Sequence, residues 1–480
     1  MTRRDFLNAA AVAGAATAAA GCAGLNRRRP VAKERPNIIY ILADDLGFGD
    51  LGCYGQKAIA TPNIDRLAKE GIRFTQHYAG DTVCAPSRSC LMTGQHTGHT
   101  RVRGNRGING QRIPLEPDDI TVAEVMKEAG YRTGLIGKWG LGEAGTTGIP
   151  TRKGFDYFFG YLNQGHAHNY YPEYLWRNEE KVYTGNVVKY YDPAVPFGGI
   201  ATKRVVYAPD LFIRETLDFV ERNRDIPFFL YWACTIPHAN NESMKMGREH
   251  GMEVPDFGRY KNKNWPDAEK GYAAMITRLD RDVGSLMAKI KELGLDNKTI
   301  VMFSSDNGPH KEGGADPEFF DSNGPLRGWK RDMYEGGIRV PLIARWPGEI
   351  SPGSVTGHIS AFWDMMPTWA ELAGVRTPRG VDGISMVPTL LGYDFRQKKH
   401  EYLYWEFHEG GGKMAVRAGI YKAVRLNADK DPNGPIELYN LREDLGEQHN
   451  IADQHPVIAK RMAHYMEIAQ TPSKEWPWQE

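Results

Sequence analysis

Acidic and amide side chains stand directly after two apolar runs of this 480-residue sequence. Asp44 and Asp45 follow the first run, and Asp306 and Asn307 follow the second. Their oxygen atoms are hard ligands, which suit calcium or magnesium better than they suit a neighbouring thiolate. An Asp-Asp pair is also common as a helix cap, and Asp-Asn-Gly is a common turn tripeptide. If the four side chains converge, they predict a divalent cation site, with calcium as the first choice and magnesium as the second.

A cysteine begins a second informative segment, Cys-Ala-Pro-Ser-Arg at residues 84–88, which is followed by Thr93 and Gly94. Pro86 is well placed as the first residue of a helix, so Cys84 is expected at or just before a helix N-terminus. Backbone N–H groups and the helix dipole favour an anion there. A single cysteine is more often a small buried apolar residue. Beside hard oxygen ligands, however, an unmodified thiol would be chemically out of place.

The elements that must position these residues are four apolar, β-rich runs, each followed by polar residues. The runs are Ile38–Leu42, Tyr131–Ile136, Phe228–Ala233 and Ile300–Phe303. Lys138 follows the second run and His238 follows the third. Helical patterns lie between the runs, at Asn63–Glu70, Thr121–Ala129 and Tyr272–Leu293. This alternation predicts an α/β fold with a large, mainly parallel sheet flanked by helices, in which ligands bind beyond the carboxyl ends of the strands.

The pattern changes near residue 392. Short strand-like segments follow at Tyr402–Phe407, Ala415–Val416 and Tyr421–Arg425, and a helical pattern covers Pro456–Ala469. These segments predict a smaller antiparallel sheet with a C-terminal helix. We therefore assign residues 36–391 to a main α/β domain, which carries the candidate site residues, and residues 392–480 to a C-terminal α+β subdomain.

The N-terminal segment predicts export. Residues 1–21 combine Arg3 and Arg4 with an Ala-rich apolar run, which is typical of a twin-arginine signal. The run ends in Ala-Ala-Gly-Cys, which resembles a lipobox, so Cys22 is either a lipidated first residue or lies near a simple cleavage site. Residues 22–35 are expected to form a polar tether. The predicted location is the periplasm or, for a lipoprotein, the cell envelope of a bacterium.

Charge and cysteine content exclude several other classes of protein. Lys+Arg 60 against Asp+Glu 59 leaves a formal charge of +1, and no block of like charges suggests a nucleic-acid partner or a polybasic membrane patch. Membrane contact is therefore expected only through the lipid anchor. Five irregularly spaced cysteines indicate neither a disulfide scaffold nor a CxxC site. Cys53, Cys90 and Cys234 are expected to be structural thiols.

The segment at residues 84–94 resembles the signature of the formylglycine-dependent sulfatase family, Cys-x-Pro-Ser-Arg followed shortly by Thr-Gly. This family belongs to the alkaline phosphatase-like superfamily and includes arylsulfatases and carbohydrate sulfatases. The resemblance implies that a maturation enzyme oxidises Cys84 to formylglycine, whose hydrate supplies the nucleophile. It also implies that residue 84 contacts the cation together with Asp44, Asp45, Asp306 and Asn307.

Further segments match motifs of the same family. Lys138 stands in Gly-Lys-Trp, His238 in Pro-His, and Lys330 between Leu-Arg-Gly-Trp and Tyr-Glu-Gly-Gly. Taken alone, each lysine would more often lie at the surface, and Arg88 would serve equally well as the partner of a carboxylate. Taken together, the resemblance implies that Arg88, Lys138 and Lys330 neutralise a sulfuryl group. It also implies that His238 protonates the leaving group.

One position departs from the family pattern, because Gly140 stands where a histidine commonly follows Gly-Lys-Trp. Candidates for that role, or for substrate contact, are His166, His168 and His310. The aromatic-rich stretch at residues 170–177 ends in Trp176 and Arg177. Its composition suits sugar rings and anions or, equally, a loop packed over the sheet. Arg327 is a further candidate for substrate contact.

The sequence therefore predicts a sulfatase that hydrolyses sulfate esters, with a sulfated glycan as the expected substrate. In the expected reaction, one hydroxyl of the hydrate at residue 84 attacks sulfur, and the other later collapses to the aldehyde and expels sulfate. Two alternatives are a phosphonate or phosphate ester hydrolase of the same superfamily and a non-catalytic glycan-binding lipoprotein. Gly140 suggests the second alternative, whereas the intact motif at residues 84–88 argues against it.

Overall fold

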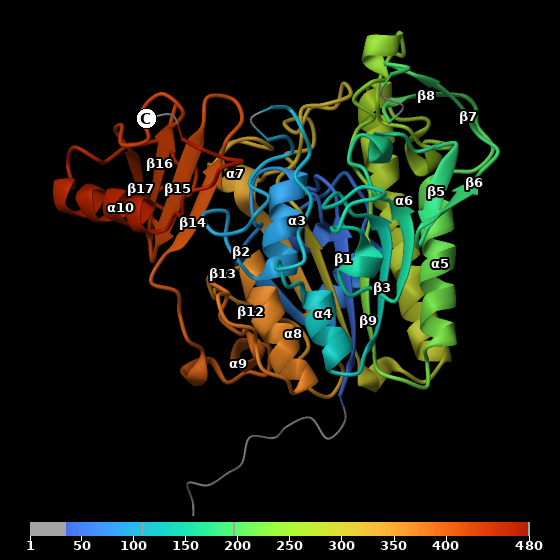
Figure 1. The fold of residues 1–480 in the computed structure, drawn as a ribbon, viewed down its shortest axis with the longest axis horizontal. Helices are drawn as coiled ribbons and strands as arrows, with labels where there is room; N and C mark the ends of the chain where they lie inside the picture. The colour runs from blue at the N-terminus through green and yellow to red at the C-terminus, as the bar shows by residue number, and fades with distance from the viewer. Residues whose placement is uncertain (1–34, 108, 195–196, 479–480) are drawn as a thin grey trace, which may run out of the picture. The chain divides into compact units, whose positions relative to one another are not determined.

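The computed structural model describes residues 35–107, 109–194 and 197–478. The predicted signal, Cys22 and all but the last residue of the tether therefore lie outside the described residues. From Pro36 onward the chain forms one compact unit. Within the described residues, a large mixed sheet occupies its centre (Figure 1). In spatial order its strands are β12 (Ser354–Thr356), β2 (Ile72–Tyr78), β11 (Arg339–Arg345), β10 (Thr299–Ser305), β1 (Asn37–Ala43), β9 (Phe228–Ala233), β3 (Arg132–Lys138), β4 (Tyr157–Tyr161), β5 (Tyr174–Arg177) and β6 (Glu180–Tyr183), and β13 (Ser360–Ala361) also pairs with β2.

The four strands predicted from apolar runs are confirmed as the four central neighbours β10, β1, β9 and β3. All three pairings among them are parallel, as is the pairing of β3 with β4. Antiparallel strands extend the sheet on both sides, through β11 and β2 at one edge and β5 and β6 at the other. Because the central strands are parallel and neighbouring, their carboxyl ends meet at one edge of the sheet.

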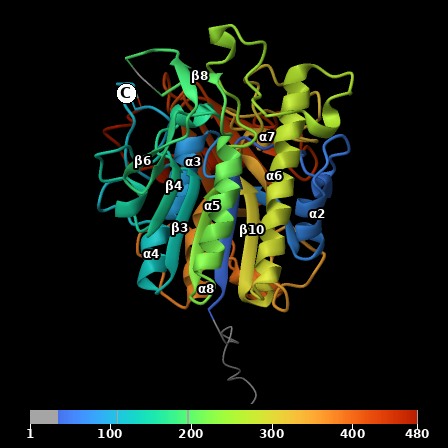
Figure 2. The same ribbon diagram turned by 90° about the vertical axis from the view of Figure 1, so that its right-hand side faces the viewer.

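Helices cover both faces of the sheet. One face carries α2 (Pro62–Lys69), α5 (Ala208–Arg222) and α6 (Asp267–Glu292), and the other carries α3 (Cys84–Thr93), α4 (Val122–Glu128) and α8 (Met365–Ala373) (Figure 2). Successive residues of β1 therefore point to different cores. Ile39 and Ile41 belong to the core beneath α5 and α6, whereas the Tyr40 ring contacts Trp369 of α8 at 5.1 Å.

The predicted helices are confirmed with small shifts of their boundaries. The helix expected at Tyr272–Leu293 begins earlier, at Asp267, directly after Pro266. Asp267 and Glu269 occupy its first turn, where negative charge is favourable. Within the described residues, none of the helices is long and apolar enough to cross a membrane.

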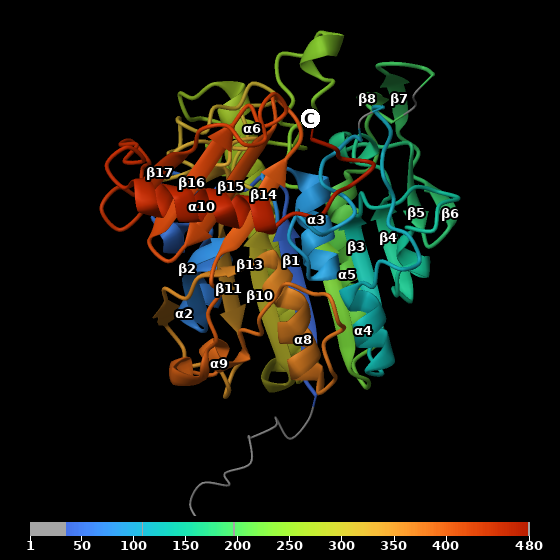
Figure 3. The same ribbon diagram turned by 60° about the vertical axis from the view of Figure 1, so that its left-hand side comes forward.

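The C-terminal part forms a separate antiparallel sheet with one helix across it (Figure 3). Its elements are β14 (Leu403–Phe407), β15 (Lys413–Ala418), β16 (Tyr421–Leu426), β17 (Glu437–Asn440) and α10 (Pro456–Ile468). Three of these strands and the helix were predicted, whereas β17 was not. Apart from short 3-10 helices, the remaining described elements are the ribbon of β7 (Val187–Tyr190) and β8 (Gly199–Lys203) and the short helices α7 (Glu335–Ile338) and α9 (Val387–Leu390).

Candidate active site

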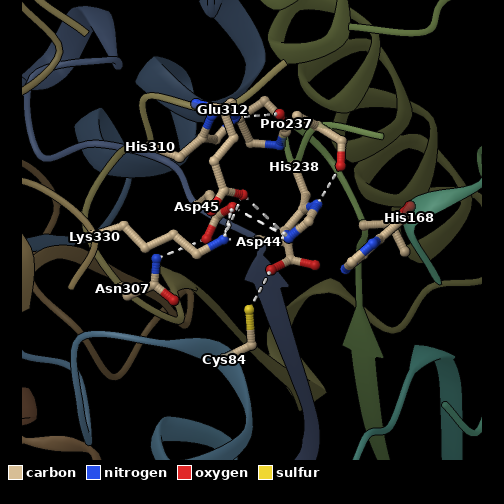
Figure 4. Close-up of polar contacts among 12 residues, drawn as sticks. Asp44, Asp45, Cys84, His168, Pro237, His238, Asn307, His310, Glu312 and Lys330 are labelled. Carbon is tan, nitrogen blue, oxygen red and sulfur yellow. Dashed lines mark hydrogen bonds and ion pairs between the residues drawn. The ribbon is translucent and has the colours of Figure 1, made fainter. Parts of the chain in front are cut away.

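The residues predicted to bind the cation or to act in catalysis converge at the carboxyl edge of the central strands. Figure 4 shows six of them side by side: Asp44, Asp45, Cys84, His238, Asn307 and Lys330. Asp44 and Asp45 directly follow β1, and Asp306 and Asn307 directly follow β10. The amide nitrogen of Asp45 donates to Asp306 Oδ1 at 3.1 Å, and Asn307 Nδ2 donates to Asp45 Oδ1 at 2.7 Å. All four residues are buried. The ends of two neighbouring strands thus form one cluster of oxygen-bearing side chains.

Cys84 reaches this cluster from the face of the sheet that carries α3. It is the first residue of α3, so the prediction that it lies at a helix N-terminus is confirmed, whereas Pro86 is the third residue of the helix and not the first. Its Sγ lies 3.3 Å from Asp44 Oδ1. Burial raises the pKa of the Cys84 thiol well above its ordinary value, and the neighbouring Asp44 carboxylate raises it further. The thiol therefore stays protonated and is a poor nucleophile as it stands.

Arg88, one helical turn after Cys84, anchors α3 to the ends of two strands. Its Nε and Nη2 donate to Asp306 Oδ2 at 3.0 and 2.8 Å, and its Nη1 donates to the Lys138 carbonyl at 2.7 Å. Ser87 Oγ adds a hydrogen bond of 2.5 Å to the Asp306 carbonyl. Arg88 therefore holds the start of α3 against the ends of β10 and β3.

Two buried lysines carry positive charge to the aspartates. Lys138 Nζ lies 2.6 Å from Asp44 Oδ2, and Lys330 Nζ lies 2.8 Å from Asp45 Oδ2. Lys330 also donates to Glu312 Oε2 at 3.0 Å. Burial alone would raise the pKa of Asp44, but the charges of Lys138, His238 and Arg88 together outweigh burial and hold that pKa below its ordinary value. Both lysines are therefore fixed at the site as ammonium groups.

His238 lies beside Lys330 and is held in one tautomer. Its Nδ1 donates to the Ala239 carbonyl at 2.6 Å, so in the neutral ring Nε2 is the acceptor and faces Lys330 Nζ at 3.3 Å. Burial lowers the pKa of His238 to about 3, and Lys330 contributes to the same shift. Tyr170 supports the loop, because its hydroxyl contacts the carbonyls of Thr235 and His238 at 2.5 and 2.6 Å.

The arrangement fits a divalent cation. Ligand atoms of Asp44, Asp45, Cys84 and His238 all lie within 4.8 Å of one another. Among the described residues, Asn307 Oδ1 is buried and has no hydrogen-bond partner. Burial and the charge of Asp44 raise the pKa of Asp306 to about 7, so the cluster holds more negative charge than its surroundings readily stabilise. A cation bound by oxygen atoms would relieve both features.

Two of the three candidate histidines adjoin His238. The ring of His168 stacks on that of His238, with centroids 4.9 Å apart and planes inclined by 19°, and its Nδ1 donates to Glu242 Oε2 at 3.0 Å. His310 Nε2 donates to the Pro237 carbonyl at 3.2 Å. The third, His166, is buried instead between aromatic rings of the core, with centroids 5.0 Å from Tyr161 and 4.7 Å from Tyr174.

The other three predicted substrate contacts are engaged elsewhere. Trp176 and Arg177 belong to β5, the last strand but one of the sheet, where Arg177 forms an ion pair with Glu215 of α5 and Trp176 packs on Tyr174. Arg327 donates to the Glu447 carbonyl at 2.6 Å, and its guanidinium carbon lies 3.8 Å from the centroid of the Tyr334 ring. These contacts pack the fold, and their role in substrate binding stays a prediction.

A cavity of about 560 Å³ adjoins the site and includes residues that the sequence did not indicate. Its lining includes Arg112, Gly140, Glu143, Gln164, His168 and Glu242. Gln164 fills the space beside Gly140, since a Cβ at Gly140 would lie 2.2 Å from Gln164 Nε2. Glu312, the partner of Lys330, was also missed. Gln164 lies three residues after β4, a strand that the sequence did not predict, and Glu312 lies in a loop seven residues after β10, so neither was indicated by a predicted strand end.

Comparisons with known proteins agree with this geometry. The chain matches the family model described as Sulfatase over residues 36–375 and the model described as N-sulphoglucosamine sulphohydrolase, C-terminal, over residues 327–471. It is 33% identical to human (Homo sapiens) arylsulfatase A, covering 89% of this chain and 85% of that protein. It is also 33% identical to N-acetylgalactosamine-6-sulfatase of Canis lupus familiaris, covering 82% and 72%, respectively.

A solved structure extends the similarity to three dimensions. The crystal structure of Ps i-CgsB in complex with k-i-k-neocarrahexaose superimposes with a TM-score of 0.74 at 29% identity, covering 93% of this chain and 95% of that one. The alkaline phosphatase-like fold implied by the motifs is thereby confirmed. Sequence motifs, strand-end geometry and matches over most of the chain agree, and the chain belongs to the sulfatase family of sulfuric ester hydrolases.

Proposed function

We propose that this sulfatase hydrolyses sulfate esters of a sulfated carbohydrate through a formylglycine made from Cys84. The observation that carries the proposal is the position of Cys84. It begins a buried helix, lies 3.3 Å from Asp44, and shares its surroundings with the buried cations Arg88, Lys138 and Lys330. A protonated thiol has little use there, whereas an aldehyde hydrate would place a hydroxyl nucleophile among groups that stabilise an anion.

The hydrate solves the problem of releasing sulfate. One hydroxyl of residue 84 attacks sulfur, the bond between sulfur and the ester oxygen breaks, and the alcohol leaves. The second hydroxyl then loses its proton and forms the carbonyl, so the carbon–oxygen bond to the sulfate breaks and sulfate departs. Water need not attack sulfur in this scheme. A maturation enzyme that oxidises Cys84 is the partner that the scheme requires.

The surrounding cations and His238 serve the two ends of the reacting ester. Arg88, Lys138 and Lys330 are positioned to neutralise the oxygens of the sulfuryl group. A sugar alkoxide is a poor leaving group, so it requires a proton, and His238 Nε2 is the proposed donor. The negative charge of a bound sulfate ester favours the protonated form of His238, which burial and Lys330 disfavour in the free protein.

A divalent cation, with calcium preferred to magnesium, would be held by Asp44, Asp45, Asp306 and Asn307. When bound, it would supply positive charge beside the nucleophile and the sulfuryl oxygens. The proposal predicts that calcium raises the melting temperature of chelator-treated protein, because the ion binds the folded state alone. Asn307→Leu should abolish this shift, whereas Asn297→Leu should leave it unchanged. Equal melting temperatures with and without the ion would contradict the site.

The carbohydrate substrate is supported by the names of similar proteins and by the cavity beside His168. N-acetylgalactosamine-6-sulfatase is a relative, and the similar Ps i-CgsB was solved with a neocarrahexaose. We also propose export, on the pattern of Arg3, Arg4 and the residues before Cys22. An exported enzyme would meet a glycan outside the cytoplasm, in the periplasm or at the cell envelope through a lipid anchor on Cys22.

Rates on three substrate classes test the function. The matured protein should hydrolyse 4-nitrophenyl sulfate and sulfated oligosaccharides at least 100-fold faster than a 4-nitrophenyl phosphate diester. A phosphate diester offers one non-bridging oxygen fewer to the cations of the site, and losing one such contact costs about 100-fold in rate. Cys84→Ala is the inactive control. Faster hydrolysis of the phosphate diester would favour a phosphodiesterase of the same superfamily. Glycan binding with no turnover by matured protein would favour a non-catalytic binding protein.

A further inference from the structure

Gln164 is a buried residue in the lining of the cavity beside the active site, and its side-chain amide has no hydrogen-bond partner among the described residues. The residue is 5% exposed, and among the described residues neither Nε2 nor Oε1 has a hydrogen-bond partner. Leaving both atoms of a buried amide unpaired is unfavourable. Gln164 also lines a cavity of about 560 Å³, so a turn of its buried side chain towards the cavity would bring the amide to a group bound there.

Backbone geometry fixes Gln164 beside the strand that carries Lys138. The pairing of β3 with β4 continues past both strands, since Trp139 N donates to Tyr161 O at 2.9 Å and Gly140 N donates to Leu162 O at 3.0 Å. Gly140 has a φ of +85°, and a Cβ there would lie 2.2 Å from Gln164 Nε2. The absence of a side chain at position 140 therefore gives the Gln164 amide its place.

The cavity that Gln164 lines also adjoins His238, the proposed proton donor to the leaving group. His168 lines the cavity together with Gln164 and stacks on His238 at 4.9 Å. On the other side, Lys138 ends β3 two residues before Gly140 and reaches Asp44 at 2.6 Å. Gln164 thus lines the cavity into which the alcohol part of a sulfate ester would extend.

We propose that Gln164 is a specificity-determining residue that binds a hydroxyl group of a carbohydrate leaving group. An amide offers one acceptor and two donor hydrogens, and a sugar hydroxyl both donates and accepts, so one hydroxyl or a neighbouring pair satisfies both atoms. A nitrophenyl group has no hydroxyl and gains nothing from this contact. The inference rests on the proposed function, because it assigns the leaving group of that reaction.

The test compares two kinds of substrate in Gln164→Ala. The sugar panel is galactose 4-sulfate, galactose 6-sulfate, N-acetylgalactosamine 6-sulfate and glucosamine 6-sulfate, and the reference is 4-nitrophenyl sulfate. We expect kcat/KM for the accepted sugars to fall by about 10- to 100-fold, and to fall much less for the reference. Equal losses on both kinds of substrate would overturn the inference.

Two further variants separate hydrogen bonding from packing. Gln164→Met keeps the length of the side chain but removes the amide, so it should show the same sugar-specific loss as Gln164→Ala. Gly140→Ala should also reproduce it, because the new Cβ displaces the amide. Wild-type kcat/KM on sugars in Gln164→Met would assign the residue to packing alone. Melting temperatures establish that each variant is folded.

The outcomes also distinguish this inference from the proposed function. If matured wild-type protein hydrolyses 4-nitrophenyl sulfate but none of the panel sugars, the reaction class stands and the hydroxyl-binding role is contradicted. If neither kind of substrate is hydrolysed, the proposed function itself fails. A selective loss on sugars in Gln164→Ala and Gln164→Met supports both.

Discussion

Cys84 begins the family signature at residues 84–88, but its surroundings oppose ordinary cysteine chemistry. The thiol is buried, its pKa is raised by burial and by Asp44, and its nearest polar partner is a carboxylate oxygen. Catalytic thiolates are normally stabilised by surroundings that lower their pKa. The surroundings of residue 84 therefore suit a hydrated aldehyde better than a thiol. A substitution at residue 84 alone tests this conclusion.

Cys84→Ser is expected to permit at most a single turnover. A serine hydroxyl can attack sulfur and release the alcohol, but it has no second hydroxyl with which to expel the sulfate. Rapid mixing with 4-nitrophenyl sulfate should give no more than one equivalent of nitrophenol per protein, with a stable sulfate ester on residue 84. Cys53→Ser, at a half-buried cysteine outside the site, should turn over like wild type. Sustained turnover by Cys84→Ser would refute the scheme.

Lys330 links the predicted site to Glu312, which the sequence did not reveal. Lys330→Met should lower kcat/KM for 4-nitrophenyl sulfate by at least about 100-fold, because it removes a buried cation that we propose neutralises the sulfuryl oxygens. The matched control is Lys311→Met, since Lys311 is partly exposed and pairs with Glu318 at 3.1 Å. Equal activity of Lys330→Met and Lys311→Met would remove Lys330 from the sulfate site.

At the scale of elements, α3 depends on its attachment to the end of β10. Ser87 Oγ donates to the Asp306 carbonyl at 2.5 Å and accepts from the Gly80 amide at 3.1 Å. Ser87→Ala leaves both backbone groups without this partner, so the free energy of unfolding should fall by about 2 kcal/mol. Urea unfolding followed by circular dichroism measures it.

The control for this prediction is a serine whose hydroxyl makes only a local contact. Ser285 lies on the exposed side of α6, where its Oγ donates to the Arg281 carbonyl at 3.2 Å. Ser285→Ala should change the free energy of unfolding by no more than about 0.5 kcal/mol. A loss at Ser87 as small as that at Ser285 would show that this hydroxyl does not hold α3 in place.

The strands that carry the site were predictable because each combines an apolar run with polar residues directly after it. Parallel pairing then brings Asp44, Lys138, His238 and Asp306 to one edge without further information. The strands outside the central four were less visible in the sequence. In β2, buried and half-exposed residues alternate imperfectly, so its sequence lacks the continuous apolar run of the central strands.

Residues that act through packing across the fold could not be found from spacing. Gln164 meets Gly140 only because the backbone pairing of β3 and β4 continues past their ends. The aromatic stretch that begins at Tyr170 was open to two interpretations, a sugar platform or a packed loop. The structure places Tyr170 and Tyr171 in the core, where each stacks or packs on Tyr207.

At the scale of the whole molecule, buried ion pairs join the two sheets. Lys422 of β16 lies 3.1 Å from both Glu335 of α7 and Glu447, and Glu335 also pairs with Arg339 of β11 at 3.1 Å. Trp405 of β14 donates from its indole to the backbone directly after β2, at 3.0 Å from the carbonyl acceptor. The two sheets should therefore unfold together.

This junction should make stability depend on pH. Burial raises the pKa of Glu447 to about 7, and the charge of Glu335 adds to that rise while Lys422 opposes it. The folded state therefore binds this proton more tightly than the unfolded chain. The resulting stability is present below the ordinary carboxyl pKa and is lost as pH rises through about 7.

Glu447→Gln should flatten this dependence, because the variant has no proton to lose. The difference in melting temperature between variant and wild type should shift in favour of the variant as pH rises from about 6 to about 8. Glu443→Gln, at an exposed position nearby, should keep the wild-type profile. Parallel profiles for wild type and Glu447→Gln would contradict the prediction.

Peptide mass spectrometry across residue 84 tests the central claim most directly. The protein should be produced in a host that matures a control sulfatase, and its sulfatase activity should be measured on the same sample. The account predicts the aldehyde or its hydrate in place of the Cys84 thiol, in a fraction of molecules that rises and falls with activity. Full activity in protein that carries only unmodified cysteine at residue 84 would contradict it.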